Sequence, residues 1–122
     1  MIFKSDPGSE FFSDERCFIT EILNTDAIQD VSIARARVEP GVTAELHRLS
    51  VDEVYYILEG SGIVEIDNSF RGKVAKGDVV HIRSGLAQRI TNISDSDLLF
   101  LCICSPKFKP ETYTSLEQNR EE

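Results

Sequence analysis

The sequence predicts an all-β protein, and three observations lead to this prediction. Short segments rich in Val, Ile, Tyr, Phe and Thr recur along the chain, and turn-forming residues separate them roughly every 8–12 residues, as in β-sandwiches and barrels. Between these segments, no stretch carries the apolar periodicity of a helix of about ten residues. The length of 122 residues suits one domain with its own core. We therefore expect a single small antiparallel β-barrel.

The strands are expected in the middle of the chain, where Gly, Pro, Asn, Asp and Ser cluster between the apolar segments and favour turns. The turn Asp67-Asn68-Ser69 is expected to close a hairpin between residues 62–66 and a further strand near Phe70. The other expected strands are residues 17–23, 32–38, 54–58, 78–82, 88–93 and 98–104.

The two ends of the chain have a different composition. Residues 1–16 mix Pro, Gly, Ser and acidic residues around Phe11 and Phe12, which indicates an extended arm that docks in part. Residues 106–122 contain two prolines and end in a charged stretch, which indicates a short helical or frayed tail. The barrel is therefore expected between these ends.

Charge and hydropathy exclude two classes of function. The chain has 13 basic and 21 acidic residues, and its net charge of −8 would be repelled by nucleic acid. No apolar run approaches the roughly 20 residues of a membrane-spanning helix. The first residues lack the apolar stretch of a secretion signal, so we expect a cytoplasmic protein that binds neither nucleic acid nor membrane.

The three cysteines, an odd number without a secretion signal, indicate reduced thiols. Cys102 and Cys104 are two residues apart, so in a strand they share one face. We expect Cys17, Cys102 and Cys104 to be inert core residues, with a redox or ligand role as the alternative.

A specific spacing begins at Gly41 and has the form G-x5-H-x-L-x3-E-x6-G. It resembles the first motif of the cupin superfamily, G-x5-H-x-H-x3-E-x6-G. Every spacing fits, and the second histidine is replaced by leucine. The matching residues are Gly41, His47, Leu49, Glu53 and Gly60.

A second spacing follows, of the form G-x5-R-x-G-x2-Q-x3-N. It resembles the second cupin motif, G-x5-P-x-G-x2-H-x3-N. Arg83 stands in place of proline and Gln88 in place of histidine, while Gly77, Gly85 and Asn92 match. The two motifs together cover residues 41–92, under half of the chain.

The resemblance implies a single cupin domain over residues 1–122, built as a small jelly-roll β-barrel. Cupins bind ligands inside the mouth of the barrel. Many hold Mn, Fe, Zn, Ni or Cu and act as dioxygenases, isomerases, cyclases or lyases, whereas others are sugar-binding or regulatory modules. Many pair as dimers through their outer strands.

The resemblance also places His47, Glu53 and Gln88 together inside the barrel. An imidazole, a carboxylate and an amide oxygen are ligands that suit a divalent metal, here Zn, Mn, Fe or Ni. One histidine and one carboxylate fall short of a two-histidine, one-carboxylate set, and a neutral amide is a weak third ligand. The alternative is that these three buried groups hydrogen-bond to one another without metal.

The alternation of side chains along the strands then predicts the remaining residues of the pocket. Side chains that share a face with the three candidates would form a largely apolar wall with a few polar groups, as small-molecule sites do. The expected pocket residues are Glu45, Leu49, Tyr55, Ile57 and Ile90.

Several other polar residues have two open interpretations. His81 belongs either to the pocket, as a substitute ligand or an acid–base group, or to the surface. Arg35 and Arg37 share a strand face and either bind an anion or form solvated pairs with acidic residues. Arg83 lies at the rim, where an anion-gripping role is the alternative to simple exposure.

Three functions are compatible with these residues. The first is a small-molecule-binding cupin with a degenerate metal site. The second is a metal-dependent enzyme, a dioxygenase or an isomerase or epimerase, that uses the reduced ligand set. The third is a structural protein with a filled interior. A homodimer is expected because apolar residues need cover, namely Phe11, Phe12, Phe18, Ile22 and Tyr56.

Overall fold

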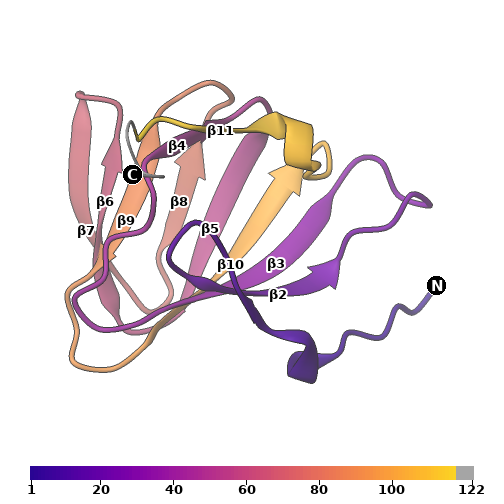
Figure 1. Ribbon diagram of the computed structural model, residues 1–122, viewed down its shortest axis with the longest axis horizontal. Helices are drawn as coiled ribbons and strands as arrows, with labels where there is room; N and C mark the ends of the chain where they lie inside the picture. The colour runs from indigo at the N-terminus through magenta and orange to yellow at the C-terminus, as the bar shows by residue number, and fades with distance from the viewer. Residues whose placement is uncertain (118–122) are drawn as a thin grey trace.

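The computed structural model describes residues 1–117 and contains two β-sheets packed face to face (Figure 1). The first sheet has six strands in the order β1 (Phe11–Phe12), β2 (Phe18–Leu23), β3 (Ser32–Val38), β10 (Leu98–Ser105), β5 (Asp52–Glu59) and β8 (Val79–Ile82). The second sheet has five strands in the order β11 (Tyr113–Ser115), β4 (His47–Leu49), β9 (Gln88–Asn92), β6 (Ser61–Ile66) and β7 (Phe70–Ala75).

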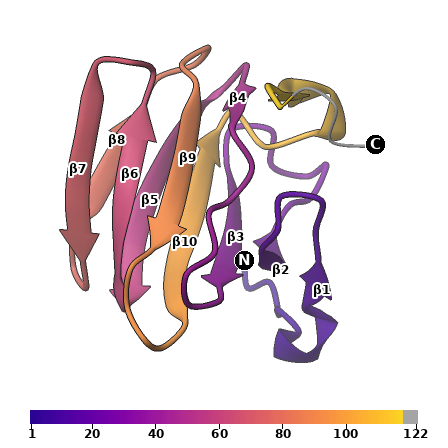
Figure 2. The same cartoon turned by 60° about the vertical axis from the view of Figure 1, so that its left-hand side comes forward.

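The fold class predicted from the sequence is confirmed, since all the strand pairs formed by these segments are antiparallel. The two sheets form a jelly roll that does not close into a continuous hydrogen-bonded barrel. The expected hairpin at Asp67-Asn68-Ser69 joins β6 to β7, with Asp67 at a φ of 52°. Figure 2 shows β1 and β2 at the end of the molecule opposite to β7.

The ends of the chain are more ordered than the composition indicated. The N-terminal arm contains the short 3-10 helix η1 (Pro7–Ser9) and then adds β1 to the edge of the first sheet. The expected helical or frayed tail differs from the structure, because after the 3-10 helix η2 (Pro110–Thr112) the chain forms β11 and pairs with β4. The last part of that tail, residues 118–122, lies outside the described residues.

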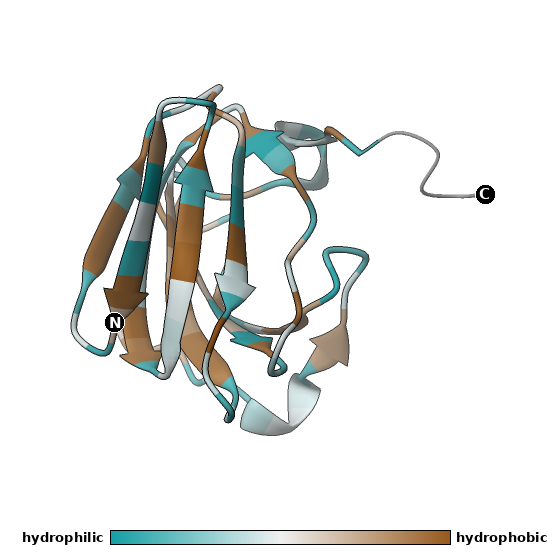
Figure 3. Ribbon diagram, turned by 90° about the vertical axis from the view of Figure 1, so that its left-hand side faces the viewer, coloured by the Kyte–Doolittle hydropathy of each residue, from teal (hydrophilic) through white to brown (hydrophobic). Residues whose placement is uncertain are grey.

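The core lies between the two sheets, and buried positions alternate with more exposed ones along strands such as β4, β5 and β9. Figure 3 shows hydrophobic and hydrophilic bands along the strands. The largest fully buried apolar side chains are Phe100, Ile57, Ile82, Ile90 and Leu98. No helix in the described part of the chain is long and apolar enough to cross a membrane.

The glycines of the two motifs explain why their spacing is so regular. Gly41, Gly60, Gly77 and Gly85 all have φ between 78° and 91°, a conformation that residues with a Cβ rarely adopt. At Gly60 an added Cβ would also lie 3.0 Å from the carbonyl oxygen of Asp97, so the turn leaves no room for a side chain. The spacing of the two motifs therefore reflects the positions of the turns as well as those of the candidate ligands.

Candidate functional site

A cavity of about 420 Å³ opens between the two sheets at the end occupied by the N-terminal arm. This volume is in the range of about 300–1,000 Å³ that small-molecule sites occupy. The walls come from β1, β2, β3, β5 and β10 on one side and from β4, β9 and β11 on the other. The cavity therefore lies inside the jelly roll, where the resemblance places ligands.

Small side chains on β3 create this space. Ser32, Ala34 and Ala36 face the interior and line the cavity, and each is paired in register with an inward residue of β10. Because these side chains fill little volume, the two sheets cannot pack against each other at this end as they do around Ile57. The cavity thus follows from a run of small residues at alternate positions of one strand.

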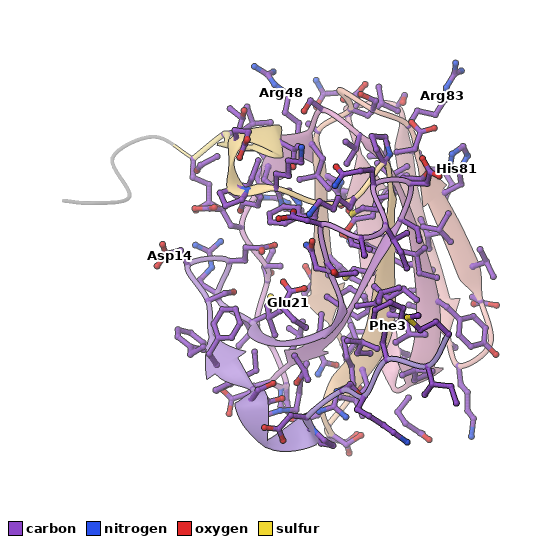
Figure 4. The ribbon with its side chains drawn as sticks, turned by 90° about the vertical axis from the view of Figure 1, so that its right-hand side faces the viewer. Phe3, Asp14, Glu21, Arg48, His81 and Arg83 are labelled. Carbon is purple, nitrogen blue, oxygen red and sulfur yellow. The ribbon has the colours of Figure 1, made fainter. Side chains whose placement is uncertain are left out.

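The mouth of the cavity is built from the N-terminal arm and β2. Phe11 and Phe12 are 49% and 60% exposed, and both line the opening together with Asp14 and Glu21. Figure 4 shows Asp14 at the outer edge of the molecule and Glu21 within its outline. Burial raises the pKa of the Glu21 carboxyl. The entrance is therefore apolar and acidic.

His47 lies deep in the cavity on β4, directly opposite Gln88 of β9. Its Nδ1 is 2.8 Å from the carbonyl oxygen of Glu45, and its ring stacks on Tyr113 with centroids 4.7 Å apart. Because a carbonyl oxygen only accepts, Nδ1 carries the proton and Nε2 the lone pair. Burial lowers the pKa of His47, although the Glu45 carbonyl and carboxylate oppose the shift, so the imidazole is neutral near pH 7.

Glu53 is a further buried polar group in the cavity wall, on β5, with only 6% of its surface exposed. Its Oε2 accepts a weak hydrogen bond from Cys104 Sγ at 3.8 Å, whereas Oε1 is buried without a hydrogen-bond partner. Burial raises the pKa of Glu53 to about 8, and the neighbouring amide of Gln88 opposes that shift. An unpaired buried oxygen is costly, so this atom is a natural contact for a ligand.

Gln88 is fully buried behind the cavity wall, where its Oε1 accepts the hydroxyl proton of Tyr55. Tyr55 itself lines the cavity and stands between Gln88 and the open space. Within residues 1–117, no hydrogen bond joins His47 to Glu53. The expected hydrogen-bonded trio is therefore incomplete, although the Gln88 amide is close enough to Glu53 to lower the pKa of that carboxyl.

The donor set does not fit a metal centre of the usual kind. Among the described residues only one imidazole lines the cavity, and the four carboxyl groups there form no ligand cluster with it. The amide oxygen of Gln88 is engaged by Tyr55, and the buried Leu49 contributes no ligand atom. Among residues 1–117, no group of three His, Cys, Asp or Glu side chains is arranged to hold a metal ion.

The remaining predicted pocket residues fall into three places. Leu49, Tyr55 and Ile90 line the cavity. Glu45 lies behind the wall, where its carboxylate accepts the hydroxyl proton of Tyr113. Ile57 differs from the expectation because it packs in the solid core, further along β5 than the cavity extends.

His81 and the arginines lie away from the cavity. Figure 4 shows His81 and Arg83 on the side of the molecule opposite to Asp14, and both are exposed. Arg37 donates to Glu10 at 2.8 Å and to Asp97 at 3.1 Å on the outer face of the first sheet. This arrangement agrees with the interpretation of Arg37 as a charge paired with acidic residues.

Sequence reasoning missed the parts of the wall that come from the ends of the chain. The arm and β2 contribute residues from Phe11 to Glu21, and the C-terminal segment contributes Phe108 and Tyr113. The available signal was the Tyr-Thr-Ser run at 113–115, whose Tyr and Thr favour strands. The prolines nearby obscured it by indicating a tail.

Comparisons with known proteins agree with this architecture. A family model described as a cupin domain matches residues 34–104. The uncharacterized protein MJ1618 of Methanocaldococcus jannaschii is 33% identical over 110 residues, covering 88% of this chain and 87% of that protein. A vicilin-like seed storage protein of Arabidopsis thaliana is also 33% identical, over 70% of this chain and 18% of its own length.

Solved structures show the same fold. Oxalate decarboxylase from Bacillus subtilis superposes with a TM-score of 0.76 at 24% identity, over 88% of this chain and 31% of the enzyme. An uncharacterized double-stranded β-helix protein from Klebsiella pneumoniae gives 0.73 at 16% identity, over 96% of this chain and 97% of that one. The chain thus spans about a third of the Bacillus enzyme and nearly all of the Klebsiella protein. By fold, by both motifs and by sequence, this chain belongs to the cupin family.

Proposed function

We propose that this protein binds a small organic molecule in the cavity between its sheets. The observation that carries the proposal is the cavity itself, whose wall is mostly apolar and contains one buried carboxyl oxygen without a partner. A protein with a purely structural role would gain stability by filling such a space. The expected cytoplasmic location stays a prediction that goes with this function.

Oxalate decarboxylation is not proposed, although proteins of that name share the fold. Oxalate is a small dianion, and such ligands are held by arginine, lysine or a metal ion. Among the described residues, neither Lys nor Arg lines the cavity, while four carboxyl groups do. The shared fold alone is therefore no reason to propose oxalate decarboxylation for this chain.

Ligand binding is tested by filling the cavity. We expect Ala34→Leu to abolish the rise in unfolding temperature that binding compounds give in a screen of small organic molecules, because the larger side chain occupies the space they need. The control is Ala75→Leu, at an exposed position on β7. Compounds that stabilise the native chain and the Ala34→Leu variant equally would show that binding takes place elsewhere.

Metal content separates simple binding from metal-dependent catalysis. We expect protein purified without chelator to contain far less than one Zn, Mn, Fe or Ni per chain. Leu49→His adds a second imidazole beside His47 on β4, and we expect it to tighten Zn or Mn binding by about tenfold or more in calorimetric titrations. One tightly bound metal per native chain would instead support catalysis, with His47, Glu53 and Gln88 as ligands.

A second copy of the chain is the proposed protein partner. Phe11 and Phe12 lie exposed on β1, an edge strand of the first sheet, and Tyr56 is 41% exposed on its outer face. Open edges and exposed aromatic side chains favour pairing between identical chains. We expect light scattering to give twice the chain mass at micromolar concentration, and a monomer mass would contradict this.

A further inference from the structure

The polar lining of the cavity is strongly one-sided in charge. Asp14, Glu15, Glu21 and Glu53 all line it, and among residues 1–117 no lysine or arginine does. The imidazole of His47 supplies no positive charge, because burial keeps it neutral. A ligand in this space would therefore meet several carboxyl groups and no fixed cation.

Glu53 adds an observation that does not depend on the number of acidic residues. Its Oε1 is buried inside the cavity wall and has no hydrogen-bond partner in the described structure. A buried carboxyl oxygen without a partner is costly, so a group that donates to it is favoured there. A ligand in the cavity can supply that donor.

The apolar part of the wall is largely aromatic. Aromatic rings favour flat or branched apolar groups, and their faces also attract cations within about 6 Å. The rings that line the cavity are those of Phe11, Phe12, Tyr55, Phe100, Phe108 and Tyr113.

We infer that the ligand is an organic cation, with a protonated amine that donates to Glu53 Oε1 and an apolar body that packs against the aromatic wall. This inference rests on the proposed function, because it names the class of molecule that the cavity binds. An ammonium group provides both the missing donor and the missing positive charge. Carboxylates and phosphates of the same size carry no donor for Glu53 Oε1 and would bring further negative charge to an acidic lining.

The electrostatic environment inside the cavity agrees with this assignment. Burial is the main cause of the raised pKa of Glu53 and of Tyr113, and the negative charge of Glu15 raises both further. The negative potential around Glu15 thus reaches both sides of the cavity. A positive group placed between them is favoured by the same field.

The experiment compares three probes of nearly equal shape: 2-phenylethylammonium, 2-phenylethanol and 3-phenylpropionate. Each is titrated by calorimetry into the full chain at pH 7, with EDTA present to exclude metal-mediated binding. We expect the ammonium to bind about tenfold tighter than the alcohol, which corresponds to one charge-assisted hydrogen bond, and the carboxylate to bind weakest. Chemical-shift changes at Tyr55 and Phe100 would locate the probe in the cavity.

Two variants test whether Glu53 and Glu15 cause the preference for the ammonium probe. Glu53→Gln keeps the shape of the side chain but cannot ionise to pair with a bound ammonium, and we expect it to lower the ratio of ammonium to alcohol affinity by about tenfold. Glu15→Gln is expected to lower the same ratio without abolishing alcohol binding. The matched control is Glu39→Gln, an exposed acidic residue on a turn outside the cavity, which should leave the ratio unchanged.

The outcomes separate the inference from the proposed function. If the alcohol or the carboxylate binds in the cavity as tightly as the ammonium, the ligand is not a cation and the inference is wrong, while small-molecule binding stands. An ammonium preference that survives both Glu53→Gln and Glu15→Gln would also overturn it. If no probe binds and Ala34→Leu changes no response in the compound screen, both the inference and the proposed function fail.

Discussion

Replacing Asn92 with alanine is expected to lower the free energy of unfolding by about 3–5 kcal/mol, because its side chain joins three segments of backbone. Asn92 is 1% exposed, and its Nδ2 donates to the carbonyl oxygens of Val38 and Ser96, each at 2.8 Å. Its Oδ1 accepts from the backbone N–H of Ser94 at 2.8 Å and from the Ser94 hydroxyl at 2.6 Å. Alanine would leave these buried groups without partners.

Chemical denaturation measures this effect, and two controls define it. Ser96→Ala keeps the carbonyl that Asn92 contacts, so it should change stability by less than about 0.5 kcal/mol. Asn92→Asp keeps the acceptor oxygen, removes the two donors and turns a carboxylate toward two carbonyl oxygens, so it should be at least as damaging as alanine. A loss below about 1 kcal/mol for Asn92→Ala would mean that the loop rearranges to satisfy its own backbone.

The second large effect is a dependence of stability on pH that originates at Glu53. Burial raises the pKa of this carboxyl to about 8, from an ordinary value of 4.5 in the unfolded chain. Between these two values the unfolded chain releases a proton that the folded chain retains, so rising pH favours unfolding. The free energy of unfolding should therefore fall by up to about 1.4 kcal/mol per pH unit in this window and level off above pH 8.

Glu53→Gln isolates this contribution, because glutamine mimics the protonated acid and does not titrate. We expect the variant and the native chain to be about equally stable near pH 5, and the variant to be more stable by about 3–5 kcal/mol at pH 9. Urea unfolding of both proteins across this range provides the measurement. Parallel stability curves would show that Glu53 ionises normally and that the cavity is wetter than its burial indicates.

The extent of sequence prediction differs between the fold and the site. The strands and the hairpin at Asp67-Asn68-Ser69 follow from local patterns, whereas the pairing of the two motifs across β4 and β9 was implied by the cupin resemblance. The site is harder because it depends on what lies across the interior. His47 and Glu53 both line the cavity, whereas Gln88 is turned behind Tyr55 and Ile57 lies in the solid core.

The sequence by itself determined the fold class and the family, because turns and alternating strands are local features. The motif glycines illustrate this, since a φ near 90° at Gly60 depends on the turn alone. Only the tertiary structure decided the shape and charge of the cavity. Phe11, Glu15 and Tyr113 come from the two ends of the chain and line the same cavity as His47, and the long-range pairing of β11 with β4 places Tyr113 there. The raised pKa of Glu53 is likewise a property of its surroundings. Burial between the two sheets removes water from its carboxyl group, and the residues next to it in the sequence do not cause this.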